Sequence, residues 1–244
     1  MFNQPLLQLN QVYTKFINYF EHLFFPDECI ICENETPNKQ TFICHLCEQE
    51  LAFSKMENTT IDQKTKKLFW GRVPIEIGFS LLYFEKANST QKILHAIKYQ
   101  NRKDFAIELG RKIGKAIKKS EINIQIDALI PVPLHVQKKF DRGYNQSELL
   151  CKGISAILNI ETNKNLVLRK KNSRSQTKLN KFLRWENAQN TYEVSKEINA
   201  KNWKHIAIVD DVITTGSTIE SIGKEILSIN PSIKISVISL ALAI

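Results

Sequence analysis

Apolar positions along the chain follow two patterns, short continuous runs and longer stretches in which they recur every three or four residues. Continuous runs of this length are typical of buried strands, and the longer spacing is typical of helices with one apolar face. The runs predict strands at residues 79–84, 126–132, 205–209 and 235–244, with a further short strand at 192–194. The spacing predicts helices over residues 93–117, from Gly143 to about 158, and over 219–229. Because strands alternate with helices, we predict an α/β fold with a parallel sheet and a ligand at its carboxyl edge.

The first part of the chain has a different pattern. Apolar residues lie at helical spacing over residues 1–25, and polar, lysine-rich residues without apolar periodicity fill 54–67. We therefore expect an N-terminal helix and cysteine module at 1–53, a linker at 54–76 and the α/β domain at 77–244. The polar face of the first helix is not notably basic, so we interpret this helix as docked on its own domain rather than on a membrane surface.

Four of the five cysteines form two Cys-x-x-Cys motifs that are eleven residues apart, at Cys29, Cys32, Cys44 and Cys47. Each motif closes a tight turn that directs two thiolates at one tetrahedral ion. No secretory signal precedes them, which disfavours disulfides, and redox motifs occur singly rather than doubled. Four thiolates complete the shell of the ion, so the sequence predicts a closed, structural zinc site. Cys151 stands alone in a helical pattern and is predicted to be a core thiol.

The segment 205–219 carries the clearest candidate chemistry. Its apolar run ends in Asp210 and Asp211, and a small turn then leads into a helix, with Thr214, Thr215, Gly216, Ser217 and Thr218 in the turn. Backbone N–H groups, hydroxyls and the helix dipole would converge there on an anion such as a phosphate. The two acids would repel a phosphate. We expect them to bind another part of the ligand, either neighbouring sugar hydroxyls or a magnesium ion.

The alternative is an ordinary strand-to-helix turn whose hydroxyls cap the helix. Capping accounts for one hydroxyl, but it leaves the other hydroxyls and the acid pair unexplained. The chain contains no Gly-x-x-x-x-Gly-Lys-Ser/Thr motif, which disfavours a P-loop NTPase.

Composition adds a preference for anionic partners. The chain has 34 Lys and Arg residues against 25 Asp and Glu residues, a formal charge of +9. This balance favours a phosphorylated substrate or nucleic acid without choosing between them. No apolar run approaches the roughly 18 residues of a membrane-spanning helix, and the N-terminus does not look like a signal peptide. We expect a cytoplasmic protein with no membrane insertion.

The strand, acid pair, turn and helix together resemble the phosphoribosyl pyrophosphate motif of type I phosphoribosyltransferases. In that family the acids bind the ribose 2- and 3-hydroxyls and the turn binds the 5-phosphate. The resemblance implies the parallel sheet of that fold, with Asp210 and Asp211 as ribose-binding residues and residues 214–218 as the phosphate site.

The whole stretch from residue 24 to 243 is similar to one branch of these proteins, the ComF family, named for a protein of bacterial competence for DNA uptake. The motifs that carry the similarity are Phe25-Pro26, the double Cys-x-x-Cys, residues 97–99 (Ile-Lys-Tyr), 131–134 (Pro-Val-Pro-Leu), 142–150 (Arg-Gly-Tyr-Asn-Gln-Ser-Glu-Leu-Leu) and the set Gln176, Leu179, Arg184 and Asn187. The chain departs from the family at Lys138 and Lys139, where arginine is usual, and at Ser173, where threonine is usual. Lysine cannot form the bidentate fork of arginine.

The resemblance implies a phosphoribosyltransferase whose acceptor the sequence does not name. Pyrophosphate would lie at the turn after Pro133, near Leu134 and Arg142, with magnesium to neutralise it. A mobile loop at 169–190 would close over the ligand and bring Arg174, Lys178 and Arg184 to the pyrophosphate. A flexible solvated loop has the same composition.

A second hypothesis is a non-catalytic nucleic-acid-binding protein that keeps the transferase fold as a scaffold. The ComF resemblance implies a role in the uptake or processing of single-stranded DNA, with a helicase-type competence partner. In this reading the basic segment 169–190, with Phe182 and Trp185 among its cations, would contact phosphates and stack on bases.

Overall fold

The computed structural model describes residues 28–36, 41–51, 63–84, 89–120, 125–170 and 191–243. The chain divides into two compact units, Met1–Leu51 and Ala52–Ile244. The predicted helix over residues 1–25 lies outside the described residues, as does most of the basic segment 169–190. The domain boundaries drawn from the sequence stay a prediction.

The described part of the first unit is built around the two cysteine motifs. A bridge pairs Glu28 with Glu35, and the backbone N–H of Cys29 donates to the Asn34 carbonyl at 2.8 Å, which closes a tight loop around the first motif. Helix α2 (His45–Gln49) begins directly after Cys44 and carries the second motif. The local sequence therefore holds each pair of thiols on a short, hydrogen-bonded turn.

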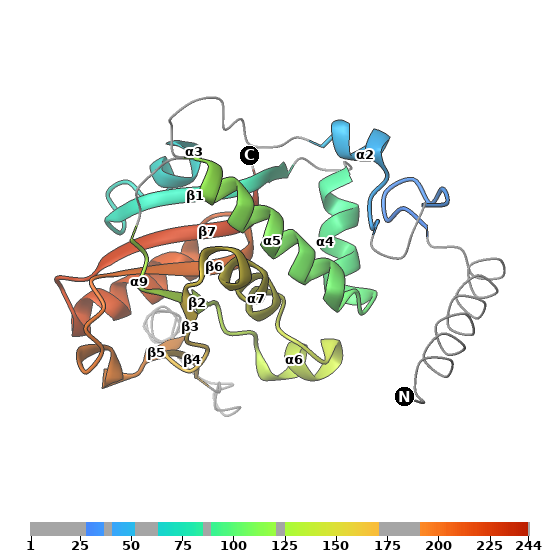
Figure 1. The fold of residues 1–244 in the computed structure, drawn as a ribbon. Helices are drawn as coiled ribbons and strands as arrows, with labels where there is room; N and C mark the ends of the chain where they lie inside the picture. Colours follow the sequence, from blue (N-terminus) through green and yellow to red (C-terminus); the bar gives the residue numbers. More distant parts are fainter. Residues whose placement is uncertain are drawn as a thin grey trace, which may run out of the picture. The chain divides into compact units, whose positions relative to one another are not determined.

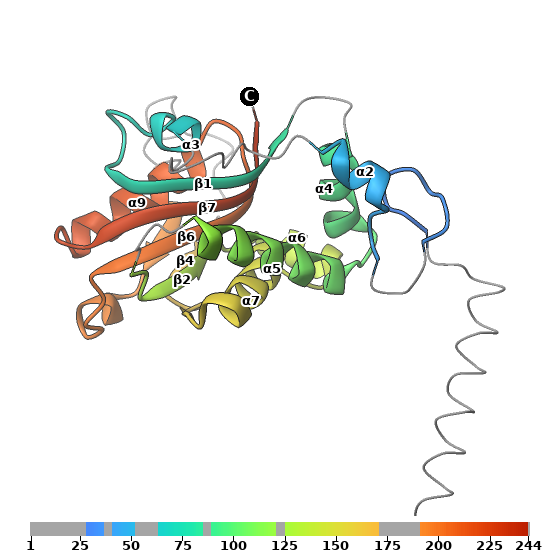
Figure 2. The same cartoon turned by 45° about the horizontal axis from the view of Figure 1, so that its top comes forward.

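The second unit contains a five-stranded sheet in which each neighbouring pair is parallel (Figures 1 and 2). In spatial order its strands are β1 (Ile75–Phe84), β7 (Lys234–Ala243), β6 (His205–Ile213), β2 (Ala128–Pro131) and β3 (Glu161–Thr162). The predicted α/β fold with a parallel sheet flanked by helices is confirmed. The sheet also places β6, the strand that leads to the acid pair, in its centre.

Helices cover both faces of the sheet. Helices α5 (Lys103–Lys119) and α7 (Gln146–Leu158) lie on one face, and α9 (Ser217–Ile229) lies on the other (Figure 1). The remaining elements of this unit are α3 (Gln63–Lys67), α4 (Ser89–Tyr99), α6 (Val136–Arg142), the 3₁₀ helix η1 (Lys196–Asn199) and an antiparallel pair, β4 (Val167–Arg169) with β5 (Tyr192–Val194). The predicted helical stretch 93–117 is thus two helices, with Asn101 between them in the left-handed region at φ 53°.

Two glycines allow α5 and α7 to pack backbone against backbone. A Cβ atom at Gly153 would lie 2.1 Å from the Ile107 carbonyl oxygen, and one at Gly110 would lie 2.3 Å from the Leu150 carbonyl oxygen. Both distances are far below van der Waals contact, so only glycine fits. This close crossing fixes α7, whose first turn reaches the acid pair.

The central strand is buried on both faces, as its continuous apolar run predicts. Ile206 and Ile208 join the core cluster beneath α9, together with Ile219, Ile222 and Ile226 of that helix. Burying this many aliphatic side chains stabilises the unit by about 1.5–3 kcal/mol for each one. The strand and the helix on either side of residues 214–218, the candidate anion turn, are therefore anchored firmly.

Two sequence predictions need correction. Strand β6 continues through the acid pair to Ile213 instead of ending at residue 209. The basic turn over residues 137–143 is the short helix α6, which ends at Gly143 with φ 74°. The range 54–76, for which the sequence predicts a linker, contains α3 and the fully buried Phe69. A single buried aromatic in a lysine-rich stretch leaves no periodic pattern, so apolar spacing does not predict this packing.

The neighbours of β6 end at different points along it. Strand β2 stops at Pro131, which pairs with Val209, whereas β7 pairs with β6 as far as Ile213. From residue 210 onward, β6 therefore lacks its partner on the β2 side. This overhang is the carboxyl edge of the sheet where ligands of parallel α/β folds bind.

Candidate functional site

Asp210 and Asp211 lie on the overhang of β6, and each has a side-chain partner from another element. The Ser147 hydroxyl, in the first turn of α7, donates to Asp210 Oδ1 at 3.3 Å. Lys98 Nζ, at the end of α4, lies 3.1 Å from Asp211 Oδ2. The Asp211 side chain is only 14% exposed. Contacts with other elements thus hold the two acids at the carboxyl edge of the sheet, and their side chains do not extend into solvent.

The pair is electrostatically strained. Burial, and after it the neighbouring Asp211 carboxylate, raise the pKa of Asp210 to about 8. The Asp211 backbone N–H, Lys98 and the Ser147 hydroxyl each lower the pKa of Asp210, but only partly offset these effects. A partly buried acid with so large a shift is a common mark of a functional site. A ligand that donates hydrogen bonds to the two carboxylates would stabilise their charged forms and so reduce this strain.

The predicted anion turn connects β6 to α9. Thr214, Thr215 and Ser217 are exposed, and Thr218 is half-buried. The N-cap residue of α9 is Gly216, which has no side chain with which to cap the helix. The capping alternative therefore does not explain the hydroxyls, although Thr215 Oγ1 accepts a 3.4 Å hydrogen bond from the Ser217 N–H.

Gly216 is required at the N-cap for two reasons. Its φ is 73°, a region that favours glycine, and an added Cβ would lie 2.7 Å from the ring of Phe69. The buried Phe69 ring thus supports the turn from behind, which sequence reasoning missed. A glycine here also lets a ligand approach the backbone closely.

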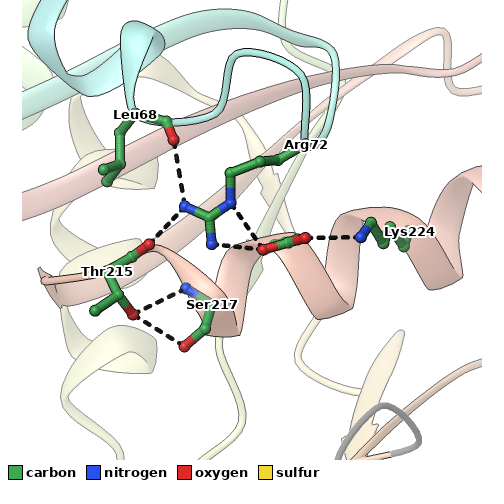
Figure 3. A network of polar contacts seen from close by, with 6 residues as sticks. Leu68, Arg72, Thr215, Ser217 and Lys224 are labelled. Atoms are coloured by element: carbon green, nitrogen blue, oxygen red, sulfur yellow. Dashed lines mark hydrogen bonds and ion pairs between the residues drawn. The ribbon is translucent and has the colours of Figure 1, made fainter.

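Arg72 also holds the turn, through contacts with Thr215 and with α9 (Figure 3). Its guanidinium donates to the Thr215 carbonyl at 2.6 Å and to the Leu68 carbonyl at 3.3 Å. Its Nε donates to Glu220 Oε2 at 2.8 Å, and its Nη2 contacts the same oxygen. One side chain therefore joins the turn, the first turn of α9 and the segment before β1.

Glu220 would otherwise repel an anion at the start of α9. Lys224 Nζ lies 2.7 Å from its Oε1, and hydrogen bonds from Lys224 and then Arg72 lower the pKa of Glu220. The charges of Lys224 and Arg72 thus outweigh that of Glu220. The N-terminus of α9 therefore keeps a positive electrostatic potential that favours an anion.

The other predicted site residues divide into two groups. Leu134 is half-buried between β2 and α6, and Arg142 ends α6, where its Nη1 donates to Gln146 Oε1 at 3.1 Å. Asn145 anchors this connection, since its Nδ2 donates to the Val132 carbonyl at 3.0 Å. The remaining three, Arg174, Lys178 and Arg184, lie outside the described residues.

The second site is the cysteine cluster. The four Sγ atoms of Cys29, Cys32, Cys44 and Cys47 all lie within 4.8 Å of one another. The sulfurs of Cys32 and Cys44 are 3.7 Å apart. A tetrahedral zinc with Zn–S bonds of about 2.3 Å separates its sulfurs by about 3.8 Å. The four residues therefore fit a structural zinc ion.

Backbone hydrogen bonds tune one of these thiols. The N–H groups of Ile31 and Cys44 donate to Cys29 Sγ at 3.4 and 3.3 Å. Burial raises the pKa of Cys29, but backbone hydrogen bonds from Cys32, Cys44 and Ile31 outweigh it and lower the pKa to about 6. The same donors would stabilise a metal-bound thiolate, the form that zinc requires.

Comparison with known proteins adds relatives but no family model, since none matches the chain. The chain is 34% identical over 135 residues to Competence protein F of Haemophilus influenzae, and the match covers 54% of the chain and 59% of the relative. It is 27% identical over 202 residues to DNA utilization protein YhgH of Shigella flexneri, covering 82% of the chain and 83% of the relative. A match to YhgH of Salmonella typhimurium, at 29% over 138 residues, covers 55% of the chain and 60% of the relative.

The thiol cluster generates a first prediction. Purified, reduced protein should contain one zinc ion per chain, and Cys47→Ala should abolish it and unfold the module around the two motifs, because metal binding and folding of so small a unit are linked. Elemental analysis measures the metal. Cys151→Ala, which removes a buried thiol elsewhere, is the matched control and should keep the ion. Metal-free wild-type protein would refute the assignment.

The Asp210 pKa generates a second prediction. Its folded value of about 8 exceeds its ordinary value of 3.8. Between these pH values the folded state holds a proton that the unfolded state releases, so this group makes stability fall as pH rises from about 4 to about 8. Asp210→Asn removes that loss and should stabilise the protein by about 1–3 kcal/mol at pH 9, with less effect at pH 4.

Denaturant unfolding at several pH values measures this difference. Exposed Asp104 provides the control, since Asp104→Asn should leave the slope of stability against pH unchanged. A wild-type slope in Asp210→Asn would contradict the prediction.

Arg72 generates a third prediction. Arg72→Ala leaves the Thr215 carbonyl and Glu220 without a shared donor, so the unfolding free energy should fall by about 1–3 kcal/mol. Arg72→Lys should rescue little, because lysine cannot make the fork of contacts. Arg111 forms an exposed pair with Glu108 at 3.0 Å, and Arg111→Ala should cost at most about 0.5 kcal/mol. Equal effects of Arg72→Ala and Arg111→Ala on thermal or denaturant unfolding would show that Arg72 does not hold the turn.

Proposed function

This chain belongs to the ComF family, and we propose that it binds phosphoribosyl pyrophosphate, together with magnesium, at the carboxyl edge of its sheet. The proposal extends to a phosphoribosyltransferase-like activity in a cytoplasmic protein linked to the uptake or processing of single-stranded DNA. The structural role of zinc in the cysteine module is part of the same proposal.

One observation carries the ligand assignment. Two carboxylates and the N-terminus of α9, whose N-cap residue is a glycine, lie at the same edge of one sheet and are separated in sequence only by residues 212–215. A ligand that carries both hydroxyl donors and an anionic group would satisfy the carboxylates and the turn together. Ribose 5-phosphate units have this arrangement: Asp210 and Asp211 would accept from the ribose hydroxyls, and residues 214–218 would donate to the 5-phosphate.

The transfer reaction requires no protein nucleophile. The bond from ribose C1 to pyrophosphate breaks with its electrons leaving on pyrophosphate, and an acceptor forms a new bond to C1. The protein would contribute by fixing the ribose and by stabilising charge as it develops. Magnesium would supply charge neutralisation on the departing pyrophosphate.

The pyrophosphate would lie beside the connection from β2 to α7. Leu134 and Arg142 belong to this connection, and Arg142 brings a cation to it. Arg174, Lys178 and Arg184 would approach from the segment 169–190 and exclude water.

The DNA role rests on the relatives, whose names refer to competence and DNA utilization. The same names favour a second candidate function, a non-catalytic nucleic-acid-binding protein that uses the transferase fold as a scaffold with a helicase-type partner. The two candidates differ in one measurable respect, since only the first requires the acid pair to bind phosphoribosyl pyrophosphate.

Asp211→Asn should weaken binding of phosphoribosyl pyrophosphate by about 1–3 kcal/mol, because it leaves a ribose hydroxyl with a poorer acceptor. Calorimetric titration in the presence of magnesium measures the affinity. Asp104 is exposed and is not among the proposed site residues. The variant Asp104→Asn should therefore bind phosphoribosyl pyrophosphate as the wild type does. Unchanged affinity in the double variant Asp210→Asn, Asp211→Asn would sink the ligand assignment and leave the scaffold candidate.

A further inference from the structure

A pocket of about 670 Å³ opens between the end of α4, the start of α5 and helix α6. Its walls include Lys98 and Tyr99 from α4, Lys103 from α5, and Lys138, Phe140 and Arg142 from α6. The volume lies within the range of about 300–1,000 Å³ that holds small-molecule ligands. The residues that line it come from three helices of the same unit, so the fold itself forms the hollow.

The lining is strongly positive. Four cations face one acid, Asp141, whose carboxylate already accepts a 3.0 Å hydrogen bond from Gln137 Nε2. Lys98 Nζ is paired with Asp211, but Lys103 contacts only the Tyr144 ring, at 5.5 Å, among the contacts described. The charge that remains at the pocket favours an anion.

The lining also exposes aromatic surface, which a simple anion does not need. Phe140 is 83% exposed and Tyr99 is 64% exposed. The Arg142 guanidinium lies 5.1 Å from the centroid of the Tyr99 ring, so a flat cationic group and a ring already stack there. Exposed aromatic rings beside cations are the surface that nucleobases and their phosphates recognise.

We propose that this pocket binds a nucleotide, with its phosphate at the lysines and its base against Phe140 and the Tyr99–Arg142 stack. The ligand chemistry is the same for a free mononucleotide and for one nucleotide of a single strand. The pocket does not require the phosphoribosyl pyrophosphate assignment, since none of the residues of the anion turn lines it. Two lining residues adjoin both places: Lys98, through its pairing with Asp211, and Arg142, which belongs to the proposed pyrophosphate position.

The test uses the full chain at low salt with four probes: thymidine 5′-phosphate, thymidine, inorganic phosphate and a ten-residue oligothymidylate. We expect saturable binding of thymidine 5′-phosphate that is tighter than that of thymidine or of phosphate. Phe140→Ala should weaken it about 5- to 150-fold, the equivalent of about 1–3 kcal/mol for one stacked base. Because Phe140 is so exposed, its removal should leave the fold intact. Lys138→Gln should weaken binding several-fold and reduce its salt dependence.

Matched controls separate the pocket from general surface charge. Lys119 is exposed at the far end of α5, and Trp70 is an aromatic ring that is 65% exposed elsewhere. Lys119→Gln and Trp70→Ala should bind as the wild type does. Titration with phosphoribosyl pyrophosphate distinguishes failure of this proposal from failure of the ribose assignment, since Phe140→Ala should leave that affinity unchanged.

Each outcome decides the proposal. Thymidine 5′-phosphate binding that depends on Phe140 and Lys138 supports a nucleotide site, and binding of the oligothymidylate alone with the same dependence supports the strand as the source. Inorganic phosphate binding as tightly as the nucleotide, equal losses in the control variants, or no saturable binding of either nucleotide probe would overturn it.

Discussion

The unequal length of two neighbouring strands shapes the carboxyl edge of the sheet, where we propose that phosphoribosyl pyrophosphate binds. Strand β2 stops at Pro131, while β6 continues beside β7 to Ile213. The last ladder bond from this side runs from the Val132 N–H to the Val209 carbonyl at 2.9 Å, and Pro133, which follows, has no N–H to donate. The overhang gives Asp210 and Asp211 open space on one side, and it lets Ser147 and Lys98 reach them from α7 and α4. A longer β2 would fill this space with backbone.

The acid pair at this edge costs the folded state free energy, and packing in the core offsets that cost. A carboxyl group whose pKa is raised to about 8 by burial and a neighbouring carboxylate destabilises the folded state at neutral pH. Close packing of α5 against α7 and the aliphatic cluster beneath α9 provide the compensating stability. In natural proteins, groups that destabilise the folded state are commonly found where a ligand binds. The acid pair is thus better explained by binding than by folding.

The residues that pack behind the anion turn come from a different part of the chain than the turn itself. Phe69 and Arg72 come from the segment before β1, and Arg72 meets Glu220 across 148 positions of sequence. This segment, together with the buried Phe69 ring, fixes Gly216 in its left-handed conformation. An anion site made from backbone N–H groups depends on such fixed geometry, because a mobile turn would lose entropy on binding.

The sequence by itself determined the features that repeat or alternate locally. The paired Cys-x-x-Cys motifs predicted the thiol cluster, and apolar runs predicted the parallel sheet, its flanking helices and the strand–turn–helix that carries the acid pair. Only the tertiary structure decided the partners Lys98, Ser147 and Arg72, the packed helix in the expected linker, and the pocket beside α6. These arise from contacts between residues far apart in the chain, which leave no periodic signal, whereas helices, strands and metal turns are encoded by near neighbours.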